Sequence, residues 1–346
     1  MMPITGVSSD RGKLHKGHGH AVHTARRTRS ARLSDCIRQL VGRGDWGRVD
    51  RDAAIGATRE ALDLGINLFD TAHAYGFGAA EELLGEALRP EIQSARESVV
   101  IATKGGLRKD GGQTVRDSSP AALRRDLESS LRALGTDYVD IYQVHWPDPA
   151  TPIATTAETL DEFVREGLVR SVGVSNYDTR EMATFQSVRP IDTLQPPYHL
   201  FRREIEATIL PFAREHGIGV LVYGPLAHGL LSGRMTEDTT FANDDWRSKS
   251  DLFVGDTFRR NLGVVRELTQ FASRRGATVA QLAIAWTLAN PAVDVAIVGA
   301  RSPEQIRQTA PAADLRLSPD EIAQIEMILR GDVAVGGPAP EAMPRS

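Results

Sequence analysis

A chain of 346 residues with 41% hydrophobic and 25% charged residues can bury a full core. It is long enough for a single α/β barrel of roughly 250 residues or more. The sequence contains no run of about 18 apolar residues, so we expect no transmembrane helix and no membrane partner. Cys36 is the only cysteine, which excludes internal disulfides and fits a reducing compartment, the cytoplasm.

The net charge of −4 hides an asymmetry between two parts of the chain. Residues 1–43 hold nine Lys and Arg against two Asp and Glu, which leaves the remaining residues with a net charge of −11. An acidic body argues against nucleic acid as a partner. We therefore expect a small-molecule partner, and the composition does not indicate an oligomeric state.

Segments with strand and helix patterns alternate, with short turns, from residue 51 to residue 330. The spacing of apolar residues predicts helices at 51–64, 79–88, 120–134, 153–166, 178–186, 205–216, 279–289 and 302–313. Apolar runs between them predict strands at 67–70, 99–103, 139–144, 171–174, 193–195, 219–223 and 294–298. This alternation predicts a parallel sheet that is covered on both faces. Seven strands are visible, and an eighth should precede the helix that begins at Arg51.

Two further segments have no such pattern. Residues 225–257 form a long loop, and long loops in compact domains are usually functional or mobile. Residues 333–346 are rich in glycine and proline from Gly336 onward, and we expect a disordered tail there.

Four polar side chains lie at or just after the ends of predicted strands. Asp70 ends the strand at 67–70 and Tyr75 follows it, Lys104 follows 99–103, and His145 follows 139–144. Side chains at the carboxyl ends of parallel strands point into one mouth, where a barrel or an open α/β sheet does its chemistry. A carboxylate, a phenol, an ammonium and an imidazole would meet there. Such a set can protonate a carbonyl oxygen while another group delivers hydride.

The residue types suggest a role for each of the four groups. A free tyrosine ionises at about pH 10, so Tyr75 would donate a proton poorly at neutral pH unless its neighbours lowered its pKa. Lys104 can do so as a positive charge, and Asp70 would hold the lysine charged and oriented. His145 would donate a hydrogen bond to the substrate oxygen. For each residue alone, a buried ion pair or a tyrosine in the core is the commoner explanation, and the order of all four favours chemistry.

Several motifs resemble those of the aldo-keto reductases. The sequence GINLFDTA at 65–72, followed by YG at 75–76 and EELLG at 81–85, is similar to the signature of that family. The motifs ATK at 102–104, QVH at 143–145, GVSN at 173–176 and GARSPEQ at 299–305 follow in the family's order and spacing. The match covers about residues 44–329. QPPY at 195–198 and LVYGPL at 221–226 resemble the bacterial branch that includes general aldehyde reductases.

The resemblance implies an eight-stranded βα barrel, the TIM barrel, at residues 44–332. It implies an oxidoreductase that uses NADPH without a Rossmann domain, and the sequence has no glycine-rich dinucleotide fingerprint. The implied activity is the reduction of aldehydes or ketones to alcohols, with Tyr75 as general acid and hydride passing from the nicotinamide to the carbonyl carbon. No metal site is expected.

The resemblance also implies a set of cofactor contacts at the ends of later strands. Ser175, Asn176 and Gln195 could hydrogen-bond the nicotinamide carboxamide, and Tyr223 could stack beneath the ring. A helix cap for the Ser–Asn pair and a core position for Tyr223 are the alternatives. The full implied set is Ser175, Asn176, Gln195, Tyr223, Gly224, Pro225, Leu226, Arg234, Gly299, Arg301 and Gln305.

Arg301 directly precedes the helix predicted at 302–313, so a guanidinium and free backbone N–H groups would converge on an anion there, such as the 2′-phosphate of NADPH. A solvated surface arginine is the alternative. Arg234 could reach a cofactor phosphate, or it could be a solvated loop charge. Gln308 and Thr309 depart from the acidic residue and Asn that often contact the adenine in the family.

His73 and Trp146 are candidates for the substrate pocket. His73 lies between Asp70 and Tyr75, and Trp146 directly follows His145. Either side chain could instead serve only in packing.

Residues 1–43 break the pattern of the chain. They have neither strand alternation nor an apolar run long enough for the first strand, and they lack the apolar region of a signal peptide. A basic arm and a transit peptide are two explanations, and a frameshift is a third. With free choice of synonymous codons, a shift of one nucleotide lets SDCIRQL at 34–40 become RIAYGNW, and LGGHGLLVS can precede it from Ala25. This resembles the opening hairpin and first strand of the bacterial branch, so we expect the first strand to be atypical or missing.

Three functions remain open at this point. The first is an NADPH-dependent reductase of aldehydes or ketones. The second is a cofactor-binding regulatory subunit that senses redox state through a partner. The third is an inactive product that keeps the catalytic residues but has a damaged N-terminus.

Overall fold

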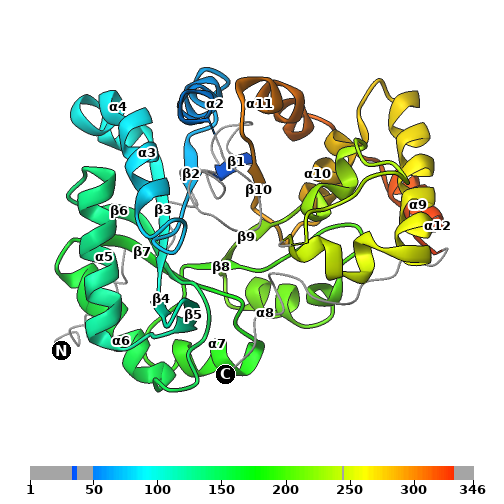
Figure 1. Ribbon diagram of the computed structural model, residues 1–346. Helices are drawn as coiled ribbons and strands as arrows, with labels where there is room; N and C mark the ends of the chain where they lie inside the picture. The colour runs from blue at the N-terminus through cyan, green and yellow to red at the C-terminus, as the bar shows by residue number, and fades with distance from the viewer. Residues whose placement is uncertain (1–32, 37–49, 244, 331–346) are drawn as a thin grey trace, which may run out of the picture.

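The computed structural model describes residues 33–36, 50–243 and 245–330 (Figure 1). Within these residues the central element is a closed parallel barrel, with the strand order β1-β10-β9-β8-β7-β6-β3-β2. The strands are β1 (Leu33–Cys36), β2 (Leu68–Asp70), β3 (Val100–Gly105), β6 (Val139–Val144), β7 (Val169–Ser175), β8 (Thr193–Gln195), β9 (Gly219–Tyr223) and β10 (Val295–Gly299). The predicted TIM barrel is confirmed.

Helices flank the barrel in the order that the sequence pattern predicts (Figure 1). Those that match predicted helices are α2 (Arg51–Asp63), α3 (Ala79–Ala87), α5 (Pro120–Leu134), α6 (Ile153–Arg165), α7 (Thr179–Gln186), α8 (Ile209–Glu215), α10 (Val279–Ala289) and α11 (Pro303–Thr309). Three helices and one hairpin were not predicted: α4 (Arg89–Ser94), α9 (Gly255–Arg274), α12 (Pro319–Leu329) and the antiparallel hairpin of β4 (Leu107–Asp110) with β5 (Gln113–Arg116). No helix of the described residues is long and apolar enough to cross a membrane.

Proline shortens two of the predicted helices. The segment predicted at 205–216 is a short 3₁₀ turn, Glu204–Glu206, followed by α8, and Pro211 lies in the first turn of α8. The segment predicted at 302–313 is α11 followed by the 3₁₀ turn Ala310–Ala313, which contains Pro311. Proline has no N–H to donate and its ring clashes with the carbonyl four residues earlier. A continuous helix through either position is therefore disfavoured.

The first strand of the barrel lies inside the N-terminal segment 1–43. β1 pairs in parallel with β10 from Leu33 to Cys36, and it pairs with β2 at Asp35 and Cys36. The expectation of an atypical strand agrees with the structure, since the sequence LSDC is poor in the residues that favour strands. The alternative of a missing strand does not agree. The rest of the segment and the predicted tail lie outside the described residues.

An apolar cluster fills the inside of the barrel. Parallel strands that are covered on both faces are expected to be apolar on both, and seven of the eight buried members of this cluster are Val, Ile, Leu or Ala. Tyr75, at the mouth, packs against this cluster. The cluster consists of Leu68, Val100, Ala102, Ile141, Leu221, Tyr223, Val295 and Ile297.

Aspartates at the amino-terminal end of the barrel accept backbone hydrogen bonds from neighbouring strands. Each lies at or just before the start of its own strand and fixes the strand beside it. The pairs are Asp140 with the N–H of Ile101, Asp192 with that of Val172 and Asp294 with that of Val220, each at 2.9 Å.

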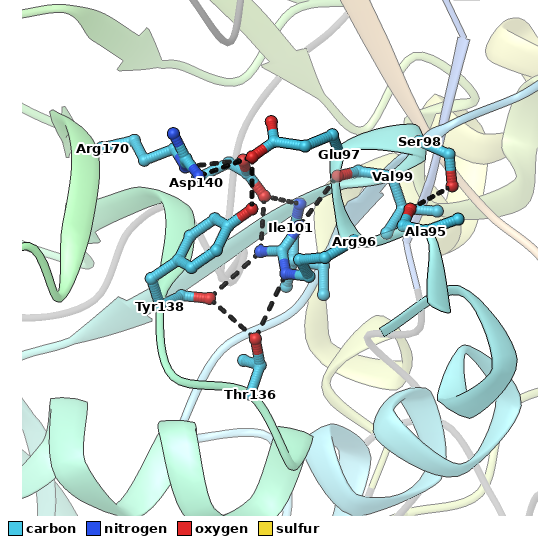
Figure 2. Close-up of polar contacts among 10 residues, drawn as sticks. All are labelled: Ala95, Arg96, Glu97, Ser98, Val99, Ile101, Thr136, Tyr138, Asp140 and Arg170. Carbon is cyan, nitrogen blue, oxygen red and sulfur yellow. Dashed lines mark hydrogen bonds and ion pairs between the residues drawn. The ribbon is translucent and has the colours of Figure 1, made fainter. Parts of the chain in front are cut away.

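One of these aspartates belongs to a larger polar group, which we call the arginine–tyrosine cluster: Arg96, Tyr138, Asp140 and Arg170 (Figure 2). The Arg96 guanidinium donates to Asp140 Oδ2 at 2.7 Å, and the same nitrogen donates to the Tyr138 carbonyl at 3.0 Å. The Tyr138 ring has a guanidinium at 4.1 Å from Arg96 and another at 4.0 Å from Arg170. The cluster joins the starts of β3, β6 and β7, so it stabilises the end of the barrel opposite the mouth.

Candidate active site

Asp70 and Lys104 form a buried ion pair at the carboxyl ends of β2 and β3. Lys104 Nζ lies 2.6 Å from Asp70 Oδ2 and donates to the Thr71 carbonyl at 2.8 Å. Both charged side chains are only 1% exposed. Removing charges from water is costly, and the close contact between the two groups offsets part of that cost.

The alternating direction of side chains along β3 explains why Lys104 reaches this position. Successive residues of a strand point to opposite faces. Lys104 points toward Asp70 inside the barrel, whereas Thr103 donates a hydrogen bond to Glu81 on helix α3 outside it.

Tyr75 and His145 face each other beside this ion pair. Their rings meet edge to face, with centroids 5.6 Å apart and planes at 81°. Lys104 Nζ lies 5.5 Å from the centroid of the Tyr75 ring. The His145 backbone N–H donates to the Gly105 carbonyl at 3.0 Å, which ties the end of β6 to the end of β3. The structure therefore brings together the four residues predicted as catalytic.

A pair of buried amides continues the network from Asp70. Gln195 Nε2 donates to Asp70 Oδ1 at 2.8 Å and to Gln143 Oε1 at 2.9 Å. Gln143 Nε2 in turn donates to Thr193 Oγ1 at 3.1 Å. Gln143 was not singled out from the sequence, although its place two residues before His145 on the same strand puts it on the inward face.

Ser175, Asn176 and Tyr223 extend this network along the mouth. Ser175 Oγ donates to the Gln195 carbonyl at 2.8 Å, and Asn176 Nδ2 donates to Ser175 Oγ at 3.0 Å. Tyr223 Oη donates to Asn176 Oδ1 at 2.9 Å, and Asn176 Nδ2 also reaches the His145 carbonyl at 3.1 Å. Three residues predicted to hold the nicotinamide are thus joined to Asp70 and Lys104 through Gln195, and to the His145 carbonyl through Asn176.

The alternatives raised for these residues have different outcomes. Ser175 and Asn176 do not cap α7, because its N-cap is Asp178, which forms a capping box with Glu181. Tyr223 does belong to the inner apolar cluster, and it also lines a cavity. A core position for Tyr223 and the predicted contact with the nicotinamide ring are therefore compatible.

This cavity has a volume of about 370 Å³ and runs from Tyr223 to helix α11. Part of its wall comes from the long loop after β9, including His228, Met235 and Arg247, which were not predicted as site residues. The predicted cofactor residues that line it are Tyr223, Gly224, Pro225, Leu226, Arg234, Gly299, Arg301 and Gln305. Ser175, Asn176 and Gln195 do not line it, and they connect to it through Tyr223.

The far end of the cavity is cationic. Arg301 precedes α11, and its backbone N–H donates to Gln305 Oε1 at 2.7 Å. Arg234 reaches α11 from the long loop by donating to Gln308 Oε1 at 2.8 Å. Two guanidinium groups therefore come from separate segments to one wall of the cavity.

Comparison with known proteins identifies the family. Residues 41–330 match the sequence model of the Aldo/keto reductase family. The chain belongs to this family. Aldo/keto reductases are oxidoreductases that reduce carbonyl groups with a nicotinamide cofactor, and the range agrees closely with the predicted match at 44–329.

Two relatives of this aldo/keto reductase cover most of both chains. The aldo-keto reductase YhdN of Bacillus subtilis (strain 168) is 41% identical over 295 residues, which is 85% of this chain and 88% of the relative. The NADH-specific methylglyoxal reductase of Escherichia coli (strain K12) is 33% identical over 307 residues, with 82% and 93% covered.

Solved structures of the family have the same fold. A glycerol dehydrogenase from Gluconobacter oxydans has a TM-score of 0.79 at 37% identity, with 89% of this chain and 94% of that chain covered. An aldo/keto reductase from Klebsiella pneumoniae, in complex with NADP and acetate, has a TM-score of 0.63 at 32% identity, with 83% and 88% covered.

The two substrate candidates lie in different surroundings in this aldo/keto reductase. The His73 ring lies between the carboxylates of Glu81 and Asp126. The half-buried Trp146 ring has the guanidinium of Arg116 at 5.0 Å from its centroid. Contact of either residue with a substrate remains a prediction.

Proposed function

We propose that this protein reduces small aldehydes or ketones to alcohols with NADPH as the hydride donor. The observation that carries the proposal is the meeting of Tyr75 and His145 beside the buried Asp70–Lys104 pair. These groups lie at the carboxyl end of the barrel, where barrel enzymes have their active sites.

The cavity suits a nicotinamide dinucleotide by the chemistry of its two ends. At the end near the catalytic residues, Tyr223 offers an aromatic wall, and at the other end Arg234 and Arg301 offer guanidinium groups for phosphates. Ser175 and Asn176 would hold the carboxamide of the nicotinamide. The bound cofactor would supply the hydride that reaches the carbonyl carbon.

The residues of the chain would supply the proton and the orientation. Tyr75 Oη would donate a proton to the carbonyl oxygen, and His145 would donate a hydrogen bond to the same oxygen. The Lys104 ammonium favours the negative charge that then remains on the phenol. Asp70 keeps that ammonium in place through the 2.6 Å contact, and Gln195 holds the other oxygen of the carboxylate.

Replacing Tyr75 with Phe tests the proposed chemistry. The change removes the proton donor and little volume, so turnover of small aldehydes with NADPH should fall by ~10²- to 10⁴-fold. Binding of NADPH, measured by fluorescence titration, should stay nearly intact. Tyr138→Phe, at the opposite end of the barrel, is the matched control and should turn over like the parent. Turnover of Tyr75→Phe within about twofold of the parent would remove Tyr75 from the mechanism.

The choice of NADPH over NADH is tested separately, because one relative is named NADH-specific. If Arg301 binds the 2′-phosphate, Arg301→Ala should weaken NADPH by about 1.5–3 kcal/mol, the scale of a hydrogen bond to a charged group, and leave NADH almost unchanged. Arg307→Ala, also on α11 but outside the cavity wall, is the control. Equal losses for both cofactors in a fluorescence titration would place the phosphate contact elsewhere.

A further inference from the structure

A histidine in the turn that carries Tyr75 lies between two buried carboxylates. His73 Nδ1 is 3.7 Å from Glu81 Oε2, and His73 Nε2 is 3.9 Å from Asp126 Oδ1. The Glu81 side chain is fully buried and that of Asp126 is 6% exposed. Only the imidazolium form of histidine carries an N–H on both ring nitrogens. Both nitrogens of this ring face an anion, so the geometry favours that form.

The other oxygens of the two carboxylates are already engaged. Glu81 Oε1 accepts from Thr103 Oγ1 at 2.6 Å, and Asp126 Oδ2 accepts from the Gly106 N–H at 2.9 Å. Within the described part of the chain, neither Glu81 Oε2 nor His73 Nδ1 has a hydrogen-bond partner. A buried polar atom without a partner is costly, and these two atoms lie 3.7 Å apart, where their opposite charges attract when the histidine is protonated.

The surroundings of His73 shift its pKa in opposite directions. Burial acts to lower the pKa of His73, and contact with Glu81 on α3 together with the charge of Asp126 on α5 outweighs it. Arg125, which is exposed on α5, opposes them weakly. The Tyr142 phenol of β6 is neutral, because burial and the same two carboxylates raise its pKa well above the ordinary value. The net effect is a raised pKa for His73.

The backbone of His73 connects the turn of Tyr75 to the strand of Lys104. The His73 N–H donates to the Lys104 carbonyl at 3.0 Å, and the His73 carbonyl accepts from the Gly78 N–H at 3.0 Å. Within this turn Phe77 has a φ of 51°, a conformation that disfavours a bulky side chain. The Phe77 ring contacts the His73 ring edge to face at 5.9 Å. Contacts outside the turn must therefore hold it in this shape.

We infer that His73, held as an imidazolium between Glu81 and Asp126, is a positioning residue that fixes the turn of Tyr75 against the strand of Lys104. Its ring bridges α3 and α5, while its backbone bonds β3. This gives His73 a role in packing rather than in contact with the substrate. The inference rests on the proposed function of Tyr75 as proton donor.

The charge of His73 makes the arrangement sensitive to pH. A pKa raised above the ordinary value of 6.5 means that the folded chain binds this proton more tightly than the unfolded chain. The stabilisation is therefore fully present below about pH 6.5, and it is lost as pH rises through the pKa of the folded state. Turnover should decline over the same range as the turn loosens.

Four variants test the inference through kinetics: His73→Gln, His73→Lys, Glu81→Gln and the double variant. His73→Gln removes the charge, so kcat should fall by ~10- to 100-fold, the scale of a small displacement of a catalytic group, while KM for NADPH is unchanged. His73→Lys restores a cation and should keep kcat at the pH where that of the parent falls. Adding Glu81→Gln to His73→Gln should cost much less than the two separate losses multiplied together. His216→Gln, at the exposed C-cap of α8, is the matched control.

NMR supplies a readout that does not depend on turnover. The His73 ring signal, identified by its loss in His73→Gln, should titrate above pH 6.5 in the parent and nearer 6.5 in Glu81→Gln. The Tyr75 ring signal, identified by its loss in Tyr75→Phe, should shift with the same midpoint. A His73 midpoint at or below 6.5, a Tyr75 signal that does not follow it, or a kcat for His73→Gln within about twofold of the parent would overturn the inference. A parent that reduces no carbonyl refutes the proposed function instead, and the two NMR titrations still decide the structural role of His73.

Discussion

The two ends of the barrel both bury a carboxylate against a cation, and they use the pair differently. At the mouth, Lys104 meets Asp70 at 2.6 Å, and at the amino-terminal end Arg96 meets Asp140 at 2.7 Å. Arg96 also makes hydrogen bonds to the carbonyls of Val99 and Tyr138 and to Thr136, so one guanidinium joins several segments. Lys104 Nζ donates to Asp70 and to the carbonyl of the next residue, Thr71, both at the end of β2.

The difference follows from the two cations. A guanidinium is a planar fork whose donors can bind several acceptors at once, whereas an ammonium is a compact point charge. At the amino-terminal end the Arg96 guanidinium binds backbone and side-chain acceptors together. The neighbouring Tyr138 ring lies between two guanidinium groups. At the mouth the compact charge lies beside Tyr75 and His145, where it can act on their chemistry. A buried ion pair alone therefore does not identify an active site, and the function proposed for the mouth depends on the neighbours of the pair.

The largest expected effect comes from breaking the pair at the mouth. Lys104→Met leaves the Asp70 carboxylate buried without its cation, which should lower the free energy of unfolding by about 3–5 kcal/mol. Turnover should be lost as well. Urea unfolding and a carbonyl reduction assay measure the two effects.

A double variant separates stability from chemistry at the same place. Adding Asp70→Asn to Lys104→Met removes the uncompensated charge, so most of the free energy of unfolding should return while turnover stays absent. If the double variant recovered turnover as well, the ion pair would serve structure at both ends of the barrel, and the contrast between them would fail.

The sequence pattern predicted most of the barrel because parallel strands are continuous apolar runs. All seven predicted strands are confirmed within two residues of their observed ends. The amphipathic helix α9 was missed, since it begins inside a segment without regular pattern and its N-cap, Val254, accepts no side-chain hydrogen bond. The start of α8 near Pro211 and the end of α11 before Pro311 were also missed, although proline offers a local signal.

The part of the site that was predicted from the sequence is the part that lies at the ends of strands. Asp70, Lys104 and His145 lie at strand ends, so the fold alone brings them together. The bond of Gln195 to Asp70 joins residues 125 positions apart, and no local pattern predicts it. The ring of His73 meets Asp126 on another helix, which again depends on packing rather than on spacing.

The first strand marks the limit of prediction from sequence. The family match begins at residue 41, after β1, whose four residues nevertheless close the barrel.

The frameshift hypothesis therefore stays a prediction, which the genomic DNA around codons 20–50 tests. We expect an insertion or deletion of one nucleotide near codons 41–44, and a repaired chain should be more soluble and hold cofactor more tightly. DNA that cannot encode LVSRIAYGNW in any frame, or equal solubility and activity of both chains, would show that residues 1–43 are a genuine arm.

The smallest expected effect comes from the amino-terminal end of the barrel. Asp140→Asn keeps the shape of the side chain but removes the charge that accepts from Arg96 and from the Ile101 N–H. The free energy of unfolding should fall by about 1–3 kcal/mol, the cost of weakening buried hydrogen bonds to a charged group, with turnover within about twofold of the parent. Glu97→Gln, whose side chain is 75% exposed at the edge of the same cluster, is the matched control and should cost less than ~1 kcal/mol. Urea unfolding at one pH measures both variants. A large loss of turnover in Asp140→Asn without a loss of stability would break the comparison, because the pair at the amino-terminal end would then affect turnover by a route other than the stability of the fold.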